Sequence, residues 1–164
     1  DELTGLHNRR GLALHLQECR RGGGAPGVGL ILIDCDRFKH INDEYGHLAG
    51  DRVLQNVAHA LRSVIAEGDL VCRLGGDEFC VLVAQGSIEL VQHMGECIVN
   101  AVQARQASSP DGCPSCSVSV GVCSIDASTS YNDWYTRADT ALYQAKRQGG
   151  NSLCVYEALP LDNS

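Results

Sequence analysis

The sequence DLVCRLGGDEFCVLVA, residues 69–84, contains two apolar segments on either side of GGDE at positions 75–78. Residues 69–74 and 79–84 predict β-strands, and the glycine pair predicts a tight turn between them. Glycine allows a ligand to approach the backbone closely, and acidic side chains at the same tip can bind a hard cation. The stretch therefore predicts a hairpin whose tip is either a nucleotide–metal site or a surface turn with solvated charges.

A second acidic strand end precedes this hairpin. Residues 28–33 (VGLILI) form a nearly continuous apolar run, typical of a buried strand, and Asp34 and Asp36 follow it directly. The next stretch, residues 38–51 (FKHINDEYGHLAGD), supplies a lysine, an amide and further carboxylates at intervals that a short helix and a turn could bring near one nucleotide. The two acidic strand ends and this stretch together indicate a nucleotide site more specifically than any one of them alone.

Four ordered blocks of the chain carry a family resemblance. They are DELTGLHNRR at 1–10, the region 34–51, GGDEF at 75–79 and ADTALYQAK at 138–146. In this order the sequence resembles the GGDEF domains of diguanylate cyclases. The resemblance covers nearly the whole chain, and it implies an enzyme that joins two GTP molecules into cyclic di-GMP and releases two pyrophosphates. It also implies a homodimer in which each subunit presents one GTP, and a sensor or regulatory domain fused to this one in the parent protein.

The chemistry requires a 3′-hydroxyl to attack an α-phosphate, for which Mg²⁺, with Mn²⁺ as the alternative, is the expected cofactor. Asp34 and Asp77 suit a hard cation, and the resemblance adds the backbone carbonyl of Cys35 as a ligand. The resemblance also makes Asp77 and Glu78 the catalytic residues. Glu78 could act as a metal ligand or could handle the hydroxyl proton, whereas Asp36 could simply cap the following helix.

Recognition of guanine requires a carboxylate and an amide placed together. The resemblance assigns these roles to Asn42 and Asp51, although either residue alone would more often be a helix cap. It also adds Phe38, and the backbone at Gly75 and Gly76, to the substrate-binding residues. The presence of Asp51 favours GTP over mixed purine nucleotides.

The resemblance assigns phosphate binding to Lys39 and Lys146. Relatives commonly carry an arginine four residues after the second lysine, but this chain has Gly150. Arg147 lies nearby in sequence, yet on a helix it points about 100° away from Lys146. One phosphate contact is therefore expected to be missing, and an arginine at position 150 is expected to tighten GTP binding.

The sequence also departs from the family at the site for product inhibition. Many relatives bind cyclic di-GMP through an Arg-x-x-Asp motif before the glycine pair, and here Ala66 stands in the arginine position, three residues before Asp69. Cys97 falls where relatives often carry a supporting arginine. A methyl group cannot replace a guanidinium in binding phosphate, so primary product inhibition is expected to be absent.

Composition excludes several other classes of protein. A net charge of −7 argues against binding long nucleic acid, and no apolar run approaches the roughly 20 residues of a membrane span. The 164 residues suffice for one domain, expected at 1–157 and followed by a tail at 158–164. The start at Asp1 suggests a fragment of a longer protein, which leaves membrane attachment of the parent open. A rival interpretation is a catalytically weak or inactive GTP-binding module that regulates a fused domain.

The nine cysteines do not suggest a disulfide framework. Their number is odd, and Cys35, Cys72, Cys80, Cys123 and Cys154 lie in or beside apolar segments where thiols pack as small hydrophobes. This usage fits a reducing cytoplasm. The CxxC at 113–116 has no second cysteine pair and no nearby histidine to complete a zinc site, so metal or redox chemistry there is the minor alternative.

The predicted fold is α/β of the α+β kind. Hydrophobic periodicity predicts helices near 8–21, 49–66, 88–107 and 133–148, and strands near 28–34, 69–74, 79–84, 117–125 and 153–156. The order βαββαβ predicts a ferredoxin-like core with a mainly antiparallel central sheet, additional helices and a short C-terminal strand, similar to polymerase palm and nucleotidyl cyclase domains. A right-handed crossover would place the first strand beside the hairpin, so that Asp34 and the acidic tip converge.

Overall fold

The computed structural model of the protein describes residues 1–25, 27–107, 112–125, 128 and 130–157. Along these residues the elements are α1 (Arg9–Arg21), β1 (Gly29–Cys35), α2 (Phe38–Tyr45), α3 (His47–Val64), β2 (Leu70–Gly75), β3 (Glu78–Val83), α4 (Ile88–Ala107), β4 (Val118–Ser124), α5 (Tyr131–Arg147) and β5 (Leu153–Val155). The predicted helices and strands are all present, with ends that differ by a few residues. The predicted tail at 158–164 lies outside the described residues.

The strands of the described chain form one sheet in the order β2-β3-β1-β4-β5. Neighbouring strands are antiparallel except β4 and β5, which are parallel. The first four strands have the arrangement of a ferredoxin-like core, and β1 lies beside the hairpin strand β3 as predicted. The unit formed by α5 and β5 extends this core at the edge next to β4.

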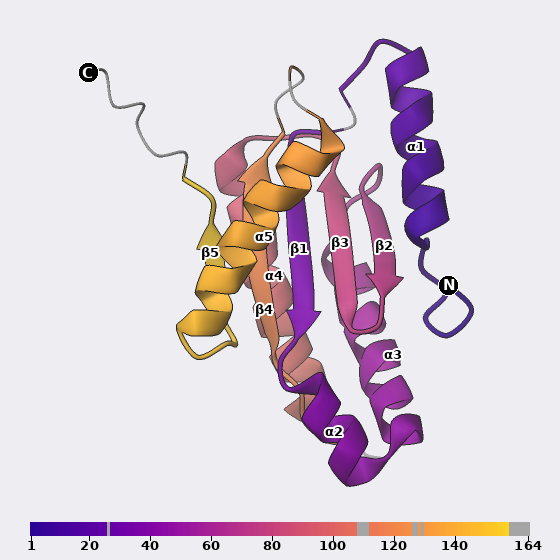
Figure 1. The fold of residues 1–164 in the computed structure, drawn as a ribbon, viewed down its shortest axis with the longest axis vertical. Coiled ribbons are helices and arrows are strands. Elements are labelled where there is room, and N and C mark those ends of the chain that lie inside the picture. The colour runs from indigo at the N-terminus through magenta and orange to yellow at the C-terminus, as the bar shows by residue number, and fades with distance from the viewer. Residues whose placement is uncertain (26, 108–111, 126–127, 129, 158–164) are drawn as a thin grey trace.

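Helices cover both faces of the sheet. Figure 1 shows α5 in front of the sheet, α3 and α4 behind it, and α1 alongside the edge strand β2. The central strand β1 alternates between the two layers: Leu30 and Leu32 pack toward α1 and α5, and Ile31 and Ile33 pack toward α3 and α4. Burial on both faces explains why this strand is almost continuously apolar.

The hairpin turn differs from the prediction by one residue. Gly75 belongs to β2, where the pairing with β3 shifts between Arg73 and Gly75, so the turn residues are Gly76 and Asp77. Gly75 and Gly76 have φ angles of +141° and +52°, which other residues rarely adopt. The bulge therefore lies at Gly75. Glu78 is the first residue of β3 and not a residue of the hairpin turn.

Helix ends follow their capping residues. At α5, Ser130 and Asp133 form a reciprocal capping box, so this helix begins at Tyr131, before the predicted start. At α3, the helix begins at His47 because Gly46 turns the chain directly after the short helix α2. The predicted short helix and turn within residues 38–51 are thus confirmed.

All nine cysteines lie in the described part of the chain, and none of them forms a disulfide there. The buried ones are Cys35, Cys72, Cys80, Cys116 and Cys123. Cys154, predicted to belong with them, is only partly buried on the edge strand β5. Within the described ranges, no helix combines the length and apolar character needed to cross a membrane.

Candidate functional site

A cavity of about 480 Å³ opens where β1 ends and α2 begins. Six predicted site residues line it, namely Asp34, Cys35, Phe38, Lys39, Asp77 and Lys146. They come from β1, α2, the hairpin turn and the last turn of α5. The two acidic strand ends therefore converge as the topology predicted, and a lysine from the opposite end of the sequence joins them.

Asp34 is the electrostatic centre of this cavity. Burial raises the pKa of its carboxyl to about 6, an effect that the nearby Lys146 opposes and the negative charges of Asp77 and Glu78 reinforce. Lys146 Nζ lies 3.0 Å from Asp34 Oδ1. Asp34 thus lies close to two other carboxylates, and its partner of opposite charge is Lys146.

The hairpin brings its two acidic residues to different places. The backbone N–H of Cys35 donates to the carbonyl of Asp77 at 3.2 Å, which fixes the turn against the end of β1. Glu78 lies directly opposite Asp34 in the β1–β3 ladder, so both side chains leave the same face of the sheet. Glu78 does not line the cavity, however, because its Oε1 accepts a hydrogen bond from the hydroxyl of Tyr135 at 2.5 Å.

Tyr135 was not among the predicted site residues. It lies in the second turn of α5, and its ring packs on the core layer between α5 and the sheet. Burial, followed by the hydrogen bond to Glu78, raises the pKa of its hydroxyl. An aromatic residue on an amphipathic helix is usually core, so the sequence carried no signal that this one also reaches the signature glutamate.

The residues predicted to recognise guanine lie on α2 and α3, beside the cavity rather than in its lining. Asn42 Oδ1 is buried and has no hydrogen-bond partner among the described residues. A Cβ atom at Gly50 would lie only 2.0 Å from this oxygen and 3.1 Å from the ring of Phe38. The absence of a side chain at Gly50 therefore leaves the space that Asn42 occupies, one residue before Asp51.

Arg147 and Gly150 lie where the sequence departs from the expected phosphate-binding pattern. The guanidinium of Arg147 lies over the ring of Tyr143, 6.0 Å from its centre, so it engages the exposed side of α5. Gly150 has a φ of +77°, and a Cβ there would lie 2.9 Å from the carboxyl group of Asp36. Neither residue supplies a cation to the cavity.

Asp36 has a role that the sequence did not predict. It does not cap α2, whose N-cap is Arg37 without a side-chain hydrogen bond. Its two oxygens accept from the hydroxyls of Ser117 and Ser119 at 2.6 Å each, and from the backbone N–H of Asn151 at 2.8 Å. This carboxylate ties the end of β1 to β4 and to the turn after α5.

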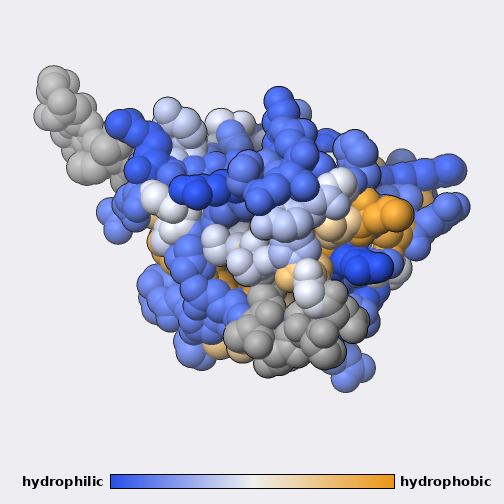
Figure 2. Space-filling model, turned by 90° about the horizontal axis from the view of Figure 1, so that it is seen from below, coloured by the Kyte–Doolittle hydropathy of each residue, from blue (hydrophilic) through white to orange (hydrophobic). Residues whose placement is uncertain are grey.

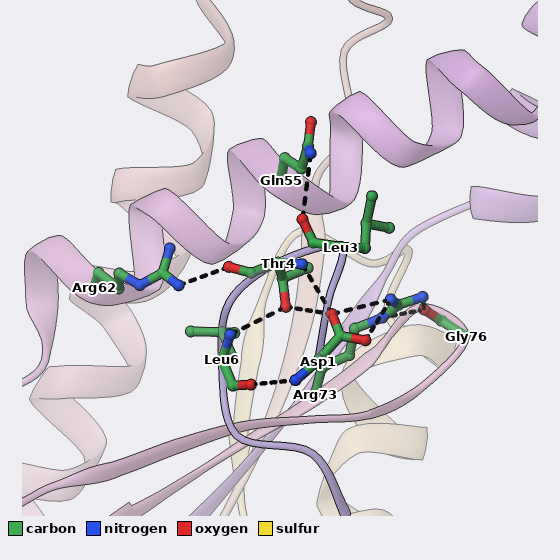
Figure 3. Close-up of polar contacts among 8 residues, drawn as sticks. All are labelled: Asp1, Leu3, Thr4, Leu6, Gln55, Arg62, Arg73 and Gly76. Carbon is green, nitrogen blue, oxygen red and sulfur yellow. Dashed lines mark hydrogen bonds and ion pairs between the residues drawn. The ribbon is translucent and has the colours of Figure 1, made fainter.

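Figure 3 shows how the first residues of the chain hold the hairpin. The carboxylate of Asp1 accepts from the backbone and hydroxyl of Thr4 and from Arg73, whose Nη1 lies 3.1 Å from Asp1 Oδ1. Arg73 Nε and Nη2 both donate to the carbonyl of Gly76, at 3.0 and 2.7 Å. The glycine turn is therefore anchored to the N-terminal segment through one arginine.

The same segment is bound to α3. Arg62 donates to the carbonyl of Thr4 at 2.6 Å, and Gln55 donates to the carbonyl of Leu3 at 3.2 Å (Figure 3). The N-terminal turn thus bridges the hairpin and the helix that begins beside the predicted guanine site.

The residues at the expected product-inhibition motif make structural hydrogen bonds. Asp69 Oδ1 accepts from the backbone N–H of Ala84, and Oδ2 accepts from that of Ala66, both at 2.9 Å. Ala66 itself is exposed. On α4, Cys97 contacts His93, with Sγ and Nε2 3.6 Å apart. The aspartate here closes the base of the β2–β3 hairpin.

Figure 2 views the molecule from the end where β1 finishes and α2 lies. Most of the visible surface is hydrophilic, with a smaller apolar area to one side.

Comparison with known proteins places this geometry in a family. The family described as "Diguanylate cyclase, GGDEF domain" matches residues 1–152. The Diguanylate cyclase DgcM of Escherichia coli (strain K12) is 40% identical over 154 residues, which cover 92% of this chain and 37% of that protein. The chain therefore spans little more than a third of the length of this relative.

Solved structures agree with this match. Diguanylate cyclase SiaD of Pseudomonas aeruginosa, in complex with its activator SiaC, is 36% identical with a TM-score of 0.84, over 94% of this chain and 60% of that one. The GGDEF domain of DgcB from Caulobacter crescentus, in complex with c-di-GMP, is 31% identical with a TM-score of 0.83, over 96% of this chain and 93% of that one.

Proposed function

The chain belongs to the family of diguanylate cyclase GGDEF domains, and we propose that it is a catalytic domain that condenses two GTP molecules into cyclic di-GMP. Two pyrophosphates leave in this reaction. We take residues 1–157 as the domain and 158–164 as its tail, and we place it in the cytoplasm, where GTP is available. Its parent protein would carry a sensor or regulatory domain.

One observation carries this proposal: the cavity at the end of β1 combines Asp34 and Asp77 with Lys39 and Lys146. Carboxylates alone would repel a triphosphate, and lysines alone would not hold a metal. Together they suit a nucleotide triphosphate bound with a divalent cation.

The residues fit a divalent cation by the chemistry of their donors. Asp34, Asp77 and the backbone carbonyl of Cys35 offer the oxygen atoms that Mg²⁺ prefers, and Mn²⁺ can use the same set. When bound, the cation would lower the pKa of the attacking hydroxyl and neutralise charge on the phosphates. Lys146, now paired with Asp34, is then available to bind phosphate oxygens.

Recognition of guanine is assigned to Asn42 and Asp51. The support is the buried Oδ1 of Asn42, because a buried polar atom without a partner is costly unless a ligand supplies one. Guanine can offer its N1–H and N2–H donors together to Asn42 and Asp51, whereas adenine offers a single 6-amino donor beside an acceptor nitrogen. Phe38 packs beside Asn42 and would bound the same site.

The reaction joins two substrates, so one site cannot complete it alone. The 3′-hydroxyl of one GTP forms a bond to the α-phosphorus of the other, its proton leaves, and the bond to pyrophosphate breaks. A two-fold dimer in which each subunit presents one GTP performs this step twice and closes the ring. Glu78 is the carboxylate that we assign to this step, as a metal ligand or as the group that receives the proton.

We also propose that product does not inhibit this domain through the site that many relatives use. Ala66 offers no guanidinium, and both oxygens of Asp69 already accept backbone hydrogen bonds. Initial rates should therefore stay constant as cyclic di-GMP is added. Calorimetric titration of cyclic di-GMP into the nucleotide-free domain provides the direct check, and tight binding would contradict this part of the proposal.

The proposal is tested by incubating the domain with GTP and Mg²⁺ over a range of protein concentrations and identifying the products by chromatography and mass spectrometry. The expected products are cyclic di-GMP and pyrophosphate, with a rate per protein molecule that rises with protein concentration. Asp34→Asn is the inactive control. GTP that binds but stays unchanged at every concentration would favour a regulatory GTP-binding module, for which Gly150 in place of the usual arginine is the specific support.

A further inference from the structure

Helix α5 contacts both of the acidic residues that face each other across β1 and β3. Lys146, in its last turn, pairs with Asp34, and Tyr135, in its second turn, donates its hydroxyl to Glu78. Asp34 and Glu78 are direct cross-strand partners, so their Cβ atoms lie about 5 Å apart. Without other contacts, two carboxylates in this position could share one cation.

The two contacts draw the carboxylates in different directions. Tyr135 and Lys146 are eleven residues apart, which corresponds to about 16 Å along the helix axis. Lys146 holds Asp34 in the cavity, whereas Tyr135 holds Glu78 outside its lining. Consistent with this separation, no group of three metal-ligating side chains is gathered anywhere in the described part of the chain.

The position of the Tyr135 hydroxyl is itself fixed by packing. Its ring is partly buried and packs against the core layer between α5 and the sheet, and it lies 6.1 Å from the ring of Tyr131 at an angle of 51°. The hydroxyl of Tyr131 is buried and has no hydrogen-bond partner among the described residues. Of these two neighbouring tyrosines, only Tyr135 reaches an acidic residue of the hairpin.

From this arrangement we propose that Tyr135 is a positioning residue that restrains Glu78 in a resting position, away from Asp34. The inference rests on the proposed function, in which Glu78 contributes to the metal-dependent step. Release of Glu78 from Tyr135 and release of Asp34 from Lys146 bring the two carboxylates together. A nucleotide phosphate can release Asp34 by binding Lys146 in its place. Release of Glu78 breaks its charge-assisted hydrogen bond with Tyr135, which costs free energy. The metal requirement of the domain is therefore set partly by α5.

The restraint predicts a change in metal affinity that can be measured without turnover. The probe is Mn²⁺, titrated into the nucleotide-free protein and followed by the loss of its free electron paramagnetic resonance signal. Tyr135→Phe removes the hydroxyl and keeps the ring. Loss of a charge-assisted hydrogen bond that opposes binding should tighten Mn²⁺ binding about tenfold.

Tyr131→Phe is the matched control, because it removes a hydroxyl of the same kind from the adjacent turn but no hydrogen bond. Its Mn²⁺ affinity should equal that of the wild type. Asp34→Asn identifies the site by weakening the binding in every background. Thermal unfolding establishes that each variant is folded.

Unchanged or weaker Mn²⁺ binding in Tyr135→Phe would overturn the inference, as would an equal gain in Tyr131→Phe. The result is independent of catalysis: if the wild type makes no cyclic di-GMP but Tyr135→Phe binds Mn²⁺ more tightly, the restraint stands and the proposed function fails. If the domain is active, the Mg²⁺ concentration that gives half the maximal rate should fall in Tyr135→Phe and not in Tyr131→Phe.

Discussion

At the scale of residues, Gly50 offers a test of the proposed guanine recognition. A Cβ at this position would lie 2.0 Å from Asn42 Oδ1, so Gly50→Ala must displace the amide assigned to guanine. We expect the preference for GTP over ATP to fall by about 1–3 kcal/mol, the value of one matched donor and acceptor. Competition binding with GTP and ATP measures this preference.

Ala49→Gly, one residue earlier, is the control. An unchanged preference for GTP in a folded Gly50→Ala variant would refute the assignment of Asn42 to guanine.

Gly150 is constrained more strongly than its sequence suggested. Its φ is +77°, and the Asp36 carboxyl that a Cβ would meet at 2.9 Å is held by three hydrogen bonds. Gly150→Ala should therefore lower the free energy of unfolding by about 1–2 kcal/mol. Gly150→Arg should share this cost and, contrary to the expectation from sequence, should not tighten GTP binding.

Chemical denaturation and nucleotide titration measure these two effects. Gly24→Ala is the control, because Gly24 has open space around it and does not have a positive φ angle. Tighter GTP binding by a fully stable Gly150→Arg variant would mean that Asp36 can leave its partners at little cost.

We expect the ionised carboxylate of Asp34 to lower the free energy of unfolding at neutral pH. The pKa of its carboxyl is raised to about 6 in the folded protein, so the folded state binds this proton more tightly than the unfolded chain does. Its contribution to the free energy of unfolding therefore falls as pH rises from about 4 to about 6, and it stays low above that range. Asn does not titrate, so Asp34→Asn should gain stability over the wild type at pH 7 and lose this advantage near pH 4.

Thermal unfolding of the metal-free protein at the two pH values checks this result. Asp43→Asn, at an exposed position on α2, controls for a general change in charge. A stability difference for Asp34→Asn that does not depend on pH would contradict the burial of a titrating carboxyl at the cavity.

At the scale of elements, the hairpin depends on Arg73. This side chain makes two hydrogen bonds to the carbonyl of Gly76 and an ion pair with Asp1 (Figure 3). A lysine cannot make this fork, so Arg73→Lys should lower the free energy of unfolding by about 1–2 kcal/mol and weaken nucleotide binding. Arg52→Lys, on the exposed side of α3, is the control. Equal stability of the two variants would show that the anchor is unimportant.

The elements of the sheet could be predicted because each leaves a local pattern in the sequence. The apolar run of β1 and the hairpin segments fixed the order of pairing, and pairing brought Asp34 to the acidic turn. The turn itself was placed one residue too early, because a bulge at Gly75 has no sequence signal distinct from a Gly-Gly turn.

The contacts that could not be predicted join residues far apart in the chain. Asp36 binds serines 81 and 83 residues away, and Tyr135 reaches Glu78 across 57 residues. Such pairs depend on side-chain directions in the assembled layers, which no single stretch of sequence determines. The assignment of the reactive carboxylates came from the family resemblance and stays a proposal, whereas their hydrogen-bond and ion-pair partners are seen only in the structure.

At the scale of the whole molecule, the account requires two subunits to act on two nucleotides. The cavity at the end of β1 combines carboxylates with lysines, and the described part of the chain offers one set of residues for the proposed recognition of guanine. Under the proposed function, the reaction would therefore depend on two GTP-loaded copies coming together, and a single copy would only bind its substrate.

The origin of the product's two halves tests most directly the central claim, that the domain joins two separate GTP molecules. The domain is incubated with Mg²⁺ and an equal mixture of unlabelled and fully ¹⁵N-labelled GTP, and the masses of the product and the amount of pyrophosphate are measured. The account predicts cyclic di-GMP in unlabelled, half-labelled and fully labelled forms at a ratio of about 1:2:1, with two pyrophosphates released for each product. Recovery of both forms of GTP unchanged, from protein shown to bind GTP, would contradict it.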